Sequence, residues 1–137
     1  MIGSMQSANQ QETGEARRYL GLWESDHAIS DKQAAKRFAE LLEGRGVPSE
    51  FNGGVYAFCA DLTAHYPEID MVPEEDLESC PWACAMESSA FHVILALRPD
   101  GYPKVFPLIL QLADVHGLVC FDPQVFKVHL PSRLKAN

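Results

Sequence analysis

The chain has 137 residues, 47% apolar and 22% charged, proportions typical of a single soluble globular domain. Its 19 acidic residues outnumber 11 basic ones and give a net charge of −8, which argues against a nucleic-acid-binding protein, because phosphate recognition needs clustered Lys and Arg. No apolar run approaches the roughly 18 residues of a membrane span, so no membrane contact is expected.

The first residues carry no recognisable targeting signal. Met1-Ile2-Gly3-Ser4-Met5 has neither a basic region nor a long apolar one, and it resembles a cloning remnant ahead of a second start at Met5. Polar residues dominate the rest of 1–16, so this stretch is expected to be a disordered tail. The sequence then predicts one α+β domain over residues 17–137 and a cytoplasmic location.

The first elements are a strand and two helices. The apolar, aromatic run Tyr19–Trp23 predicts a strand. Ser30, with Gln33 three residues later, is a capping box that predicts the start of a helix ending at Gly44. A second helix is expected over Pro48–Tyr66, where apolar residues recur at helical spacing around a pair of glycines.

The second half of the chain alternates strands with one helix. A hairpin is expected to turn at Glu87-Ser88-Ser89, and Pro107 is expected in the first turn of the later helix or at a kink. The expected ranges are Trp82–Met86 and Phe91–Leu97 for the hairpin strands, Pro103–Gly117 for the helix, Leu118–Phe121 for the next strand and Val125–Leu130 for an edge strand.

This order of elements predicts the fold class. Apart from one extra helix it is the β-α-β-β-α-β order of a ferredoxin-like two-layer sandwich, with a mostly antiparallel sheet of four to five strands and two or three helices on one face. The helices Ser30–Gly44 and Pro103–Gly117 are therefore expected on the same face, with Phe91–Leu97 as an inner strand.

Common catalytic and cofactor motifs are absent from the sequence. It contains no glycine-rich phosphate loop, no G-x-S-x-G elbow and no H-E-x-x-H. Cys59 and Cys120 lie in apolar segments, and Cys80 and Cys84 lack the second ligand pair of a zinc site, so four reduced thiols and no metal or cofactor are expected. A Cys84–His92 dyad is conceivable, but both side chains are more simply explained as structural.

Charge is segregated along the chain. Residues 46–97 contain nine acids and no Lys or Arg, whereas the other 85 residues hold ten acids and eleven bases. The densest part is Glu68–Glu78, with six acids in eleven residues, and we call it the acidic segment. A net charge of −9 in one stretch disfavours compactness through self-repulsion, so the stretch needs an explanation.

Two interpretations of the acidic segment compete. It is either a solvated loop that aids solubility or a docking surface for a basic partner, in which apolar residues among the acids supply anchors. Calcium binding is a weaker alternative, since the spacing of the acids does not match an EF-hand loop. For docking, the candidate partner-binding residues are Glu68, Asp70, Glu74, Glu75, Asp76, Glu78 and Trp82.

Three stretches resemble a group of small bacterial α+β proteins, some of which are presumed immunity proteins of polymorphic toxin systems. They are Tyr19-Leu20-Gly21-Leu22-Trp23-Glu24, Pro81-Trp82 after the acidic segment, and Ala113-Asp114-Val115-His116-Gly117-Leu118-Val119-Cys120-Phe121-Asp122-Pro123-Gln124. Gly21 interrupts the first of these as an apolar strand. The resemblance implies a role in blocking a partner and carries no catalytic residues.

The function expected from the sequence is therefore that of a non-enzymatic immunity protein, which binds and neutralises a cognate toxin with a basic surface. One alternative is a small enzyme of unknown reaction, with His92 or Glu24 near a pocket over the sheet. Another is a ferredoxin-like regulatory or ligand-binding module that self-associates through a sheet edge. The oligomeric state is left open.

Overall fold

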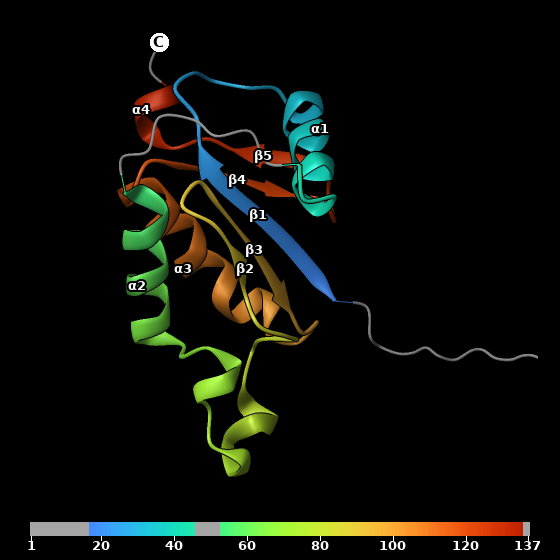
Figure 1. The fold of residues 1–137 in the computed structure, drawn as a ribbon, viewed down its shortest axis with the longest axis vertical. Coiled ribbons are helices and arrows are strands. Elements are labelled where there is room, and N and C mark those ends of the chain that lie inside the picture. Colours follow the sequence, from blue (N-terminus) through green and yellow to red (C-terminus); the bar gives the residue numbers. More distant parts are fainter. Residues whose placement is uncertain (1–16, 46–52, 136–137) are drawn as a thin grey trace, which may run out of the picture.

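A computed structural model describes residues 17–45 and 53–135 of the chain. It has an α+β fold with an open, antiparallel, five-stranded sheet in the order β2-β3-β1-β4-β5 (Figure 1). The strands are β1 (Arg18–Glu24), β2 (Glu87–Ser88), β3 (His92–Leu97), β4 (Leu118–Asp122) and β5 (Lys127–His129). The helices are α1 (Asp31–Leu42), α2 (Gly54–His65), α3 (Tyr102–Val115), α4 (Ser132–Lys135) and the 3-10 helices η1 (Ile69–Met71) and η2 (Glu74–Ser79).

Neighbouring strands of the sheet are antiparallel, so strands that run in the same direction alternate across it. β1 pairs antiparallel with both β3 and β4, and β2 pairs antiparallel with β3. It follows that β1 runs in the same direction as β2, with β3 between them, and that β3 runs in the same direction as β4, with β1 between them. The two central strands β1 and β3 are buried on both faces, as the prediction of Phe91–Leu97 as an inner strand required.

One face of the sheet is covered by α2 and α3. Alternate residues of the central strands, such as Leu20 and Leu22 of β1, point to this face. They pack against Phe58 of α2 and Ile109 of α3, all of them fully buried. This is the larger of the two cores, and it also takes in Trp82.

The opposite face is covered by α1, which corrects the expectation that this helix lies beside α3. In Figure 1, α1 lies on the side of the sheet away from α2 and α3. Its Phe38 belongs to a second core cluster with Trp23, Ile94 and Phe121. Gly21 of β1 makes room for this contact: a Cβ at that position would come 2.5 Å from Cδ1 of Phe38. The glycine that interrupts the apolar pattern of β1 is therefore the position at which the Phe38 ring packs on the sheet.

Local signals in the sequence predicted several boundaries correctly. The Ser30–Gln33 capping box is present, and Gly44, with φ of 76°, follows the end of α1. The second helix was expected from Pro48, but it begins at Gly54, after Gly53 at φ of 85°; residues 48–52 lie outside the described residues.

Two local predictions were wrong. Glu87 and Ser88, expected as a turn, form the edge strand β2 opposite Ile94 and Val93. Their side chains are exposed, so no apolar pattern marked them as a strand. Trp82–Met86, expected as the first strand of the hairpin, forms no strand and makes only an isolated bridge, between Trp82 and Leu97. Of the two places expected for Pro107, the first turn is excluded, because this residue lies inside α3.

Candidate functional site

The acidic segment forms the short helices η1 and η2 and projects beyond the end of the sheet, below α2 in Figure 1. Its six carboxylate side chains belong to exposed residues. Across residues 17–45 and 53–135, the ion pairs of the protein lie elsewhere and none involves these six acids. The negative charge of the segment is therefore not neutralised internally.

Trp82 ties the start of the acidic segment to the core. Its side chain is 2% exposed, and its Nε1–H donates to the carbonyl oxygens of Tyr66 at 3.2 Å and Pro67 at 3.0 Å. A buried indole N–H needs such an acceptor, and these two carbonyls lie where α2 ends and the segment begins. Trp82 therefore fixes the direction in which the chain leaves α2.

This burial corrects one part of the sequence interpretation. Trp82, one of the candidate partner-binding residues, could have been either an exposed anchor or a core residue, and its ring belongs to the core shared by α2 and α3. The exposed apolar side chains of the segment are instead Met71 and Leu77, at 75% and 39% exposure. Ile69 and Val72 are half-buried and pack against the core, so the segment has an inward and an outward side.

Arg98 supports the other end of the acidic segment. Its Nη1 donates to three backbone carbonyls, those of Leu77 at 3.2 Å, Glu78 at 2.9 Å and Cys80 at 3.1 Å. Its Nε lies 3.6 Å from Oδ1 of Asp100. The guanidinium thus supplies donors to carbonyls at the end of η2, where the carbonyl of Leu77 also accepts the backbone N–H of Cys80.

A cavity of about 670 Å³ lies at the base of the acidic segment. Its lining is mainly apolar, with charged groups at Arg17, Arg98 and Asp100. The remaining lining residues are Ile69, Leu77, Trp82, Ala83 and Pro99. The volume falls in the range of ligand and side-chain pockets, about 300–1,000 Å³.

The residues considered for the enzyme alternative are not brought together. Glu24 is 8% exposed and points to the α2 face, where its Oε2 accepts the backbone N–H of Gly54 at 2.9 Å. His92 stands on the opposite face and shares a hydrogen bond of 2.7 Å between Nδ1 and Oγ of Ser89. Glu24 thus places its charge at the positive N-terminal end of α2, a structural role.

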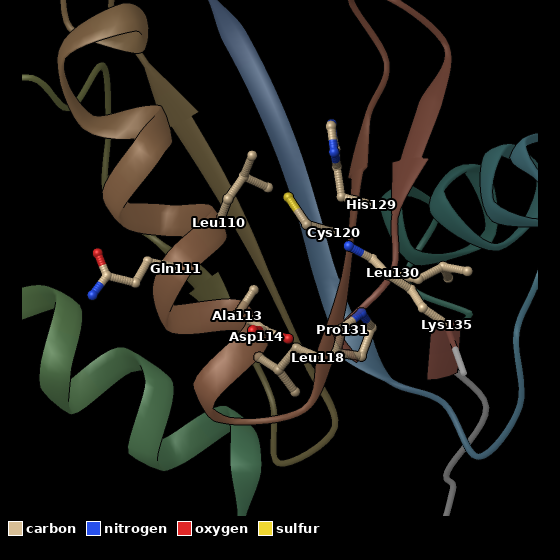
Figure 2. A pocket seen from close by; sticks show the side chains of 10 residues that line it. All are labelled: Leu110, Gln111, Ala113, Asp114, Leu118, Cys120, His129, Leu130, Pro131 and Lys135. Atoms are coloured by element: carbon tan, nitrogen blue, oxygen red, sulfur yellow. The ribbon is translucent and has the colours of Figure 1, made fainter. Parts of the chain in front are cut away.

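A second cavity, of about 280 Å³, is lined by α3 on one side and by β4, β5 and the chain leading into α4 on the other (Figure 2). Cys120 and His129, which are direct neighbours across β4 and β5, both line it. Burial raises the pKa of the Cys120 thiol, and burial together with Lys127 lowers the pKa of His129. A protonated thiol beside a neutral imidazole is not an activated nucleophile.

The cysteines are all unpaired and fall into two environments. Cys80 and Cys120 are buried, whereas Cys59 and Cys84 are half-buried. Burial, with a smaller effect of Glu68, raises the pKa of Cys59 to about 11. Sγ of Cys84 accepts a hydrogen bond from Nη1 of Arg17 at 3.7 Å. Within the described residues, His, Cys, Asp and Glu form no group of three that could hold a metal ion.

His116, the C-cap residue of α3, also links two helices. Its Nε2 lies 2.6 Å from Oδ2 of Asp61, so α3 is joined to α2 near the surface. Sequence reasoning missed this pair, and it missed Arg98 as well. The available signal for Arg98 was its position as the first basic residue after the long stretch without one.

Comparison of the chain with protein-family models, with curated proteins and with solved structures gives no match. Among the described residues, no helix has the length and apolar character needed to cross a membrane.

Proposed function

We propose that this chain is an immunity-type inhibitor, which binds and neutralises a toxin protein through the acidic segment. The observation that carries the proposal is that the segment is held in one shape although its charge is unneutralised. Trp82 and Arg98 together donate to five backbone carbonyls at its two ends. A loop that served only solubility would not need this support.

Rigid presentation favours binding for an energetic reason. A surface that is ordered before it meets its partner loses less conformational entropy on binding than a flexible loop does. The exposed Met71 and Leu77 supply apolar contact area within the acidic surface. Unpaired carboxylates around them accelerate the encounter with a basic surface, since opposite charge steers association.

The immunity assignment also draws on the resemblance described above, and it implies a cytoplasmic protein without enzymatic activity. The expected partner is a toxin with a basic surface, because toxins that act on anionic substrates carry one. Neither nucleic acid nor membrane is proposed as a partner.

We also propose that the fold is an elaborated ferredoxin-like sandwich. Two features support this. β1 lies between β3 and β4 while β3 lies between β1 and β2, and both α2 and α3 cover the same face of the sheet. In this description α1 and β5 are additions to the β-α-β-β-α-β unit, and α1 adds a layer on the second face.

The test compares two charge reversals that change the net charge equally. Glu74→Lys/Glu75→Lys alters the acidic segment. The control Glu40→Lys/Glu43→Lys, matched in charge, alters the end of α1 and its C-cap on the opposite face, where it also removes the ion pairs of Glu40 with Arg37 and of Glu43 with Arg45. The partner to test is a toxin domain: where the gene directly upstream encodes a large secreted protein with a variable C-terminal domain, that domain is the candidate. We expect the first variant to bind it more slowly and to lose protection of cells, while the control behaves like wild type.

The wild-type association rate should fall as salt rises, because the Debye length shortens to about 8 Å at physiological ionic strength. Equal association rates for wild type and Glu74→Lys/Glu75→Lys at low salt would refute the acidic segment as the binding surface. Thermal melts of both variants confirm that each is folded.

A further inference from the structure

We infer that the cavity at the base of the acidic segment receives one large apolar side chain from a lysine- and arginine-rich segment of a partner protein. This inference rests on the proposed function and names the chemistry of the partner at that site. It is drawn from the lining of the cavity and from the charge around it.

The lining favours an apolar side chain. Ile69, Leu77, Ala83 and Pro99 contribute apolar walls from four separate positions along the chain. The indole of Trp82 also lines the cavity while its Nε1–H is engaged with backbone carbonyls on another side. Trp82 therefore offers a fixed aromatic surface on which an incoming ring or aliphatic chain can pack.

The surroundings favour basic residues on both sides of that side chain. Ile69 lies between Glu68 and Asp70 in the sequence, and Leu77 lies between Asp76 and Glu78. Two apolar wall residues are thus each flanked by two exposed carboxylates. A partner segment whose apolar residue enters the cavity would place its own neighbours against these carboxylates.

The charge of Arg98 does not oppose this arrangement. Its guanidinium is occupied by the carbonyls of Leu77, Glu78 and Cys80 and lies close to Asp100. Arg17, the other cation of the lining, donates from Nη1 to Sγ of Cys84 at 3.7 Å. The four carboxylates next in sequence to Ile69 and Leu77, together with Asp100, outnumber these two arginines. The favoured occupant is a basic segment with a single apolar residue, rather than an acidic or a wholly apolar one.

The experiment is an NMR titration with two unlabelled peptides, Lys-Arg-Lys-Phe-Lys-Arg-Lys and the same peptide with Ala in place of Phe. We expect the Phe peptide to bind about 10- to 150-fold more tightly, since burying a phenyl group contributes about 1.5–3 kcal/mol. Its binding should shift the signals of the Trp82 Nε1–H and the Ala83 amide, and both peptides should weaken as salt rises.

Ala83→Trp places an indole in the cavity where the Phe side chain would pack, and it should reduce the preference for Phe while leaving the salt dependence. Ala39→Trp adds the same side chain at an exposed position of α1 and serves as the matched control. Should Ala83→Trp not fold, Leu77→Ser removes part of the wall at a partly exposed position and should reduce the preference instead.

Each remaining outcome contradicts a defined part of the inference. Equal, salt-dependent binding of both peptides refutes the cavity as an apolar pocket but leaves the proposed function standing. Binding of the Phe peptide that is equally tight to wild type and to Glu74→Lys/Glu75→Lys refutes the basic flanks and indicates a neutral apolar ligand. Absence of binding by either peptide refutes the inference, and the toxin domain then tests the proposed function separately.

Discussion

Replacing Gly21 with Ala tests the position of α1 directly. In an ordinary strand this change stabilises a protein by about 0.5–1 kcal/mol, because glycine loses more conformational entropy on folding. Here the added Cβ would lie 2.5 Å from Cδ1 and 2.9 Å from Cε1 of Phe38. The ring has little room to move, since it is buried and packs against Phe121 at a centroid distance of 5.6 Å.

The clash therefore decides the sign of the effect. Forcing an extra methyl group into a packed core costs about 1–3 kcal/mol, more than the entropic gain. We expect Gly21→Ala to lower the free energy of unfolding by about 1–2 kcal/mol. For a chain of this length that corresponds to a fall in Tm of roughly 3–7 °C.

Double-mutant cycles measured by urea denaturation locate the contact. Combined with Phe38→Leu, which removes ring atoms from the α1 face, Gly21→Ala should become neutral or stabilising, for a coupling of about 1–2 kcal/mol. Combined with Phe58→Leu, on the face covered by α2, its effect should be additive. Coupling to Phe58 instead of Phe38, or stabilisation by Gly21→Ala alone, would show that α1 does not lie on this face.

Three further predictions concern the core and its titratable groups. Trp82→Ala should lower the free energy of unfolding by about 3–5 kcal/mol, and Trp82→Phe, which keeps a ring but loses the indole N–H, by less; a melting temperature unchanged by Trp82→Ala would contradict the burial of the indole. Burial and Lys127 hold the pKa of His129 below its ordinary 6.5, so the unfolded chain takes up the proton first. Stability should therefore fall as pH drops below that value, and His129→Gln should lose part of this dependence in denaturation curves at neutral and acidic pH. Under native conditions iodoacetamide should modify the half-buried Cys84 before the fully buried Cys120, as peptide mass spectrometry will show, and early labelling of Cys120 would be inconsistent with this structure.

What could be predicted from the sequence was mainly local. The Ser30–Gln33 capping box specifies its own geometry within four residues, so α1 began where the pattern placed it. The strands β1, β3 and β4 followed from short apolar runs, and Gly44 marked a helix end because of its positive φ. These features depend on neighbours in the chain and hardly on the rest of the fold.

The face chosen by α1 was not predictable in the same way. Both faces of β1 are apolar, with Leu20 and Leu22 on one side and Trp23 on the other, so alternation could not assign a helix to either. Gly21 was the available signal, since a glycine inside a strand often marks the close approach of another group. In the sequence analysis this glycine was interpreted only as an interruption of an apolar strand.

For the candidate site, the sequence predicted where the acidic residues lie, but not which side chains hydrogen-bond to the backbone around the acidic segment. The acidic residues stand out in composition, and their exposure follows from it. The roles of Trp82 and Arg98 depend on contacts with backbone atoms 15 to 21 residues away, which no spacing rule reveals. The cavity likewise needs residues from both sides of the acidic segment.

The way in which the acidic segment is supported bears on how its specificity could change over evolutionary time. Trp82 and Arg98 donate only to main-chain oxygens in this region, and every residue type carries that oxygen. Exposed positions such as Asp70, Met71 and Glu75 can therefore mutate without removing a bond that maintains the shape. For the proposed inhibitor, such a scaffold would keep the shape of the binding surface constant while changes of exposed side chains alone alter which partner it fits.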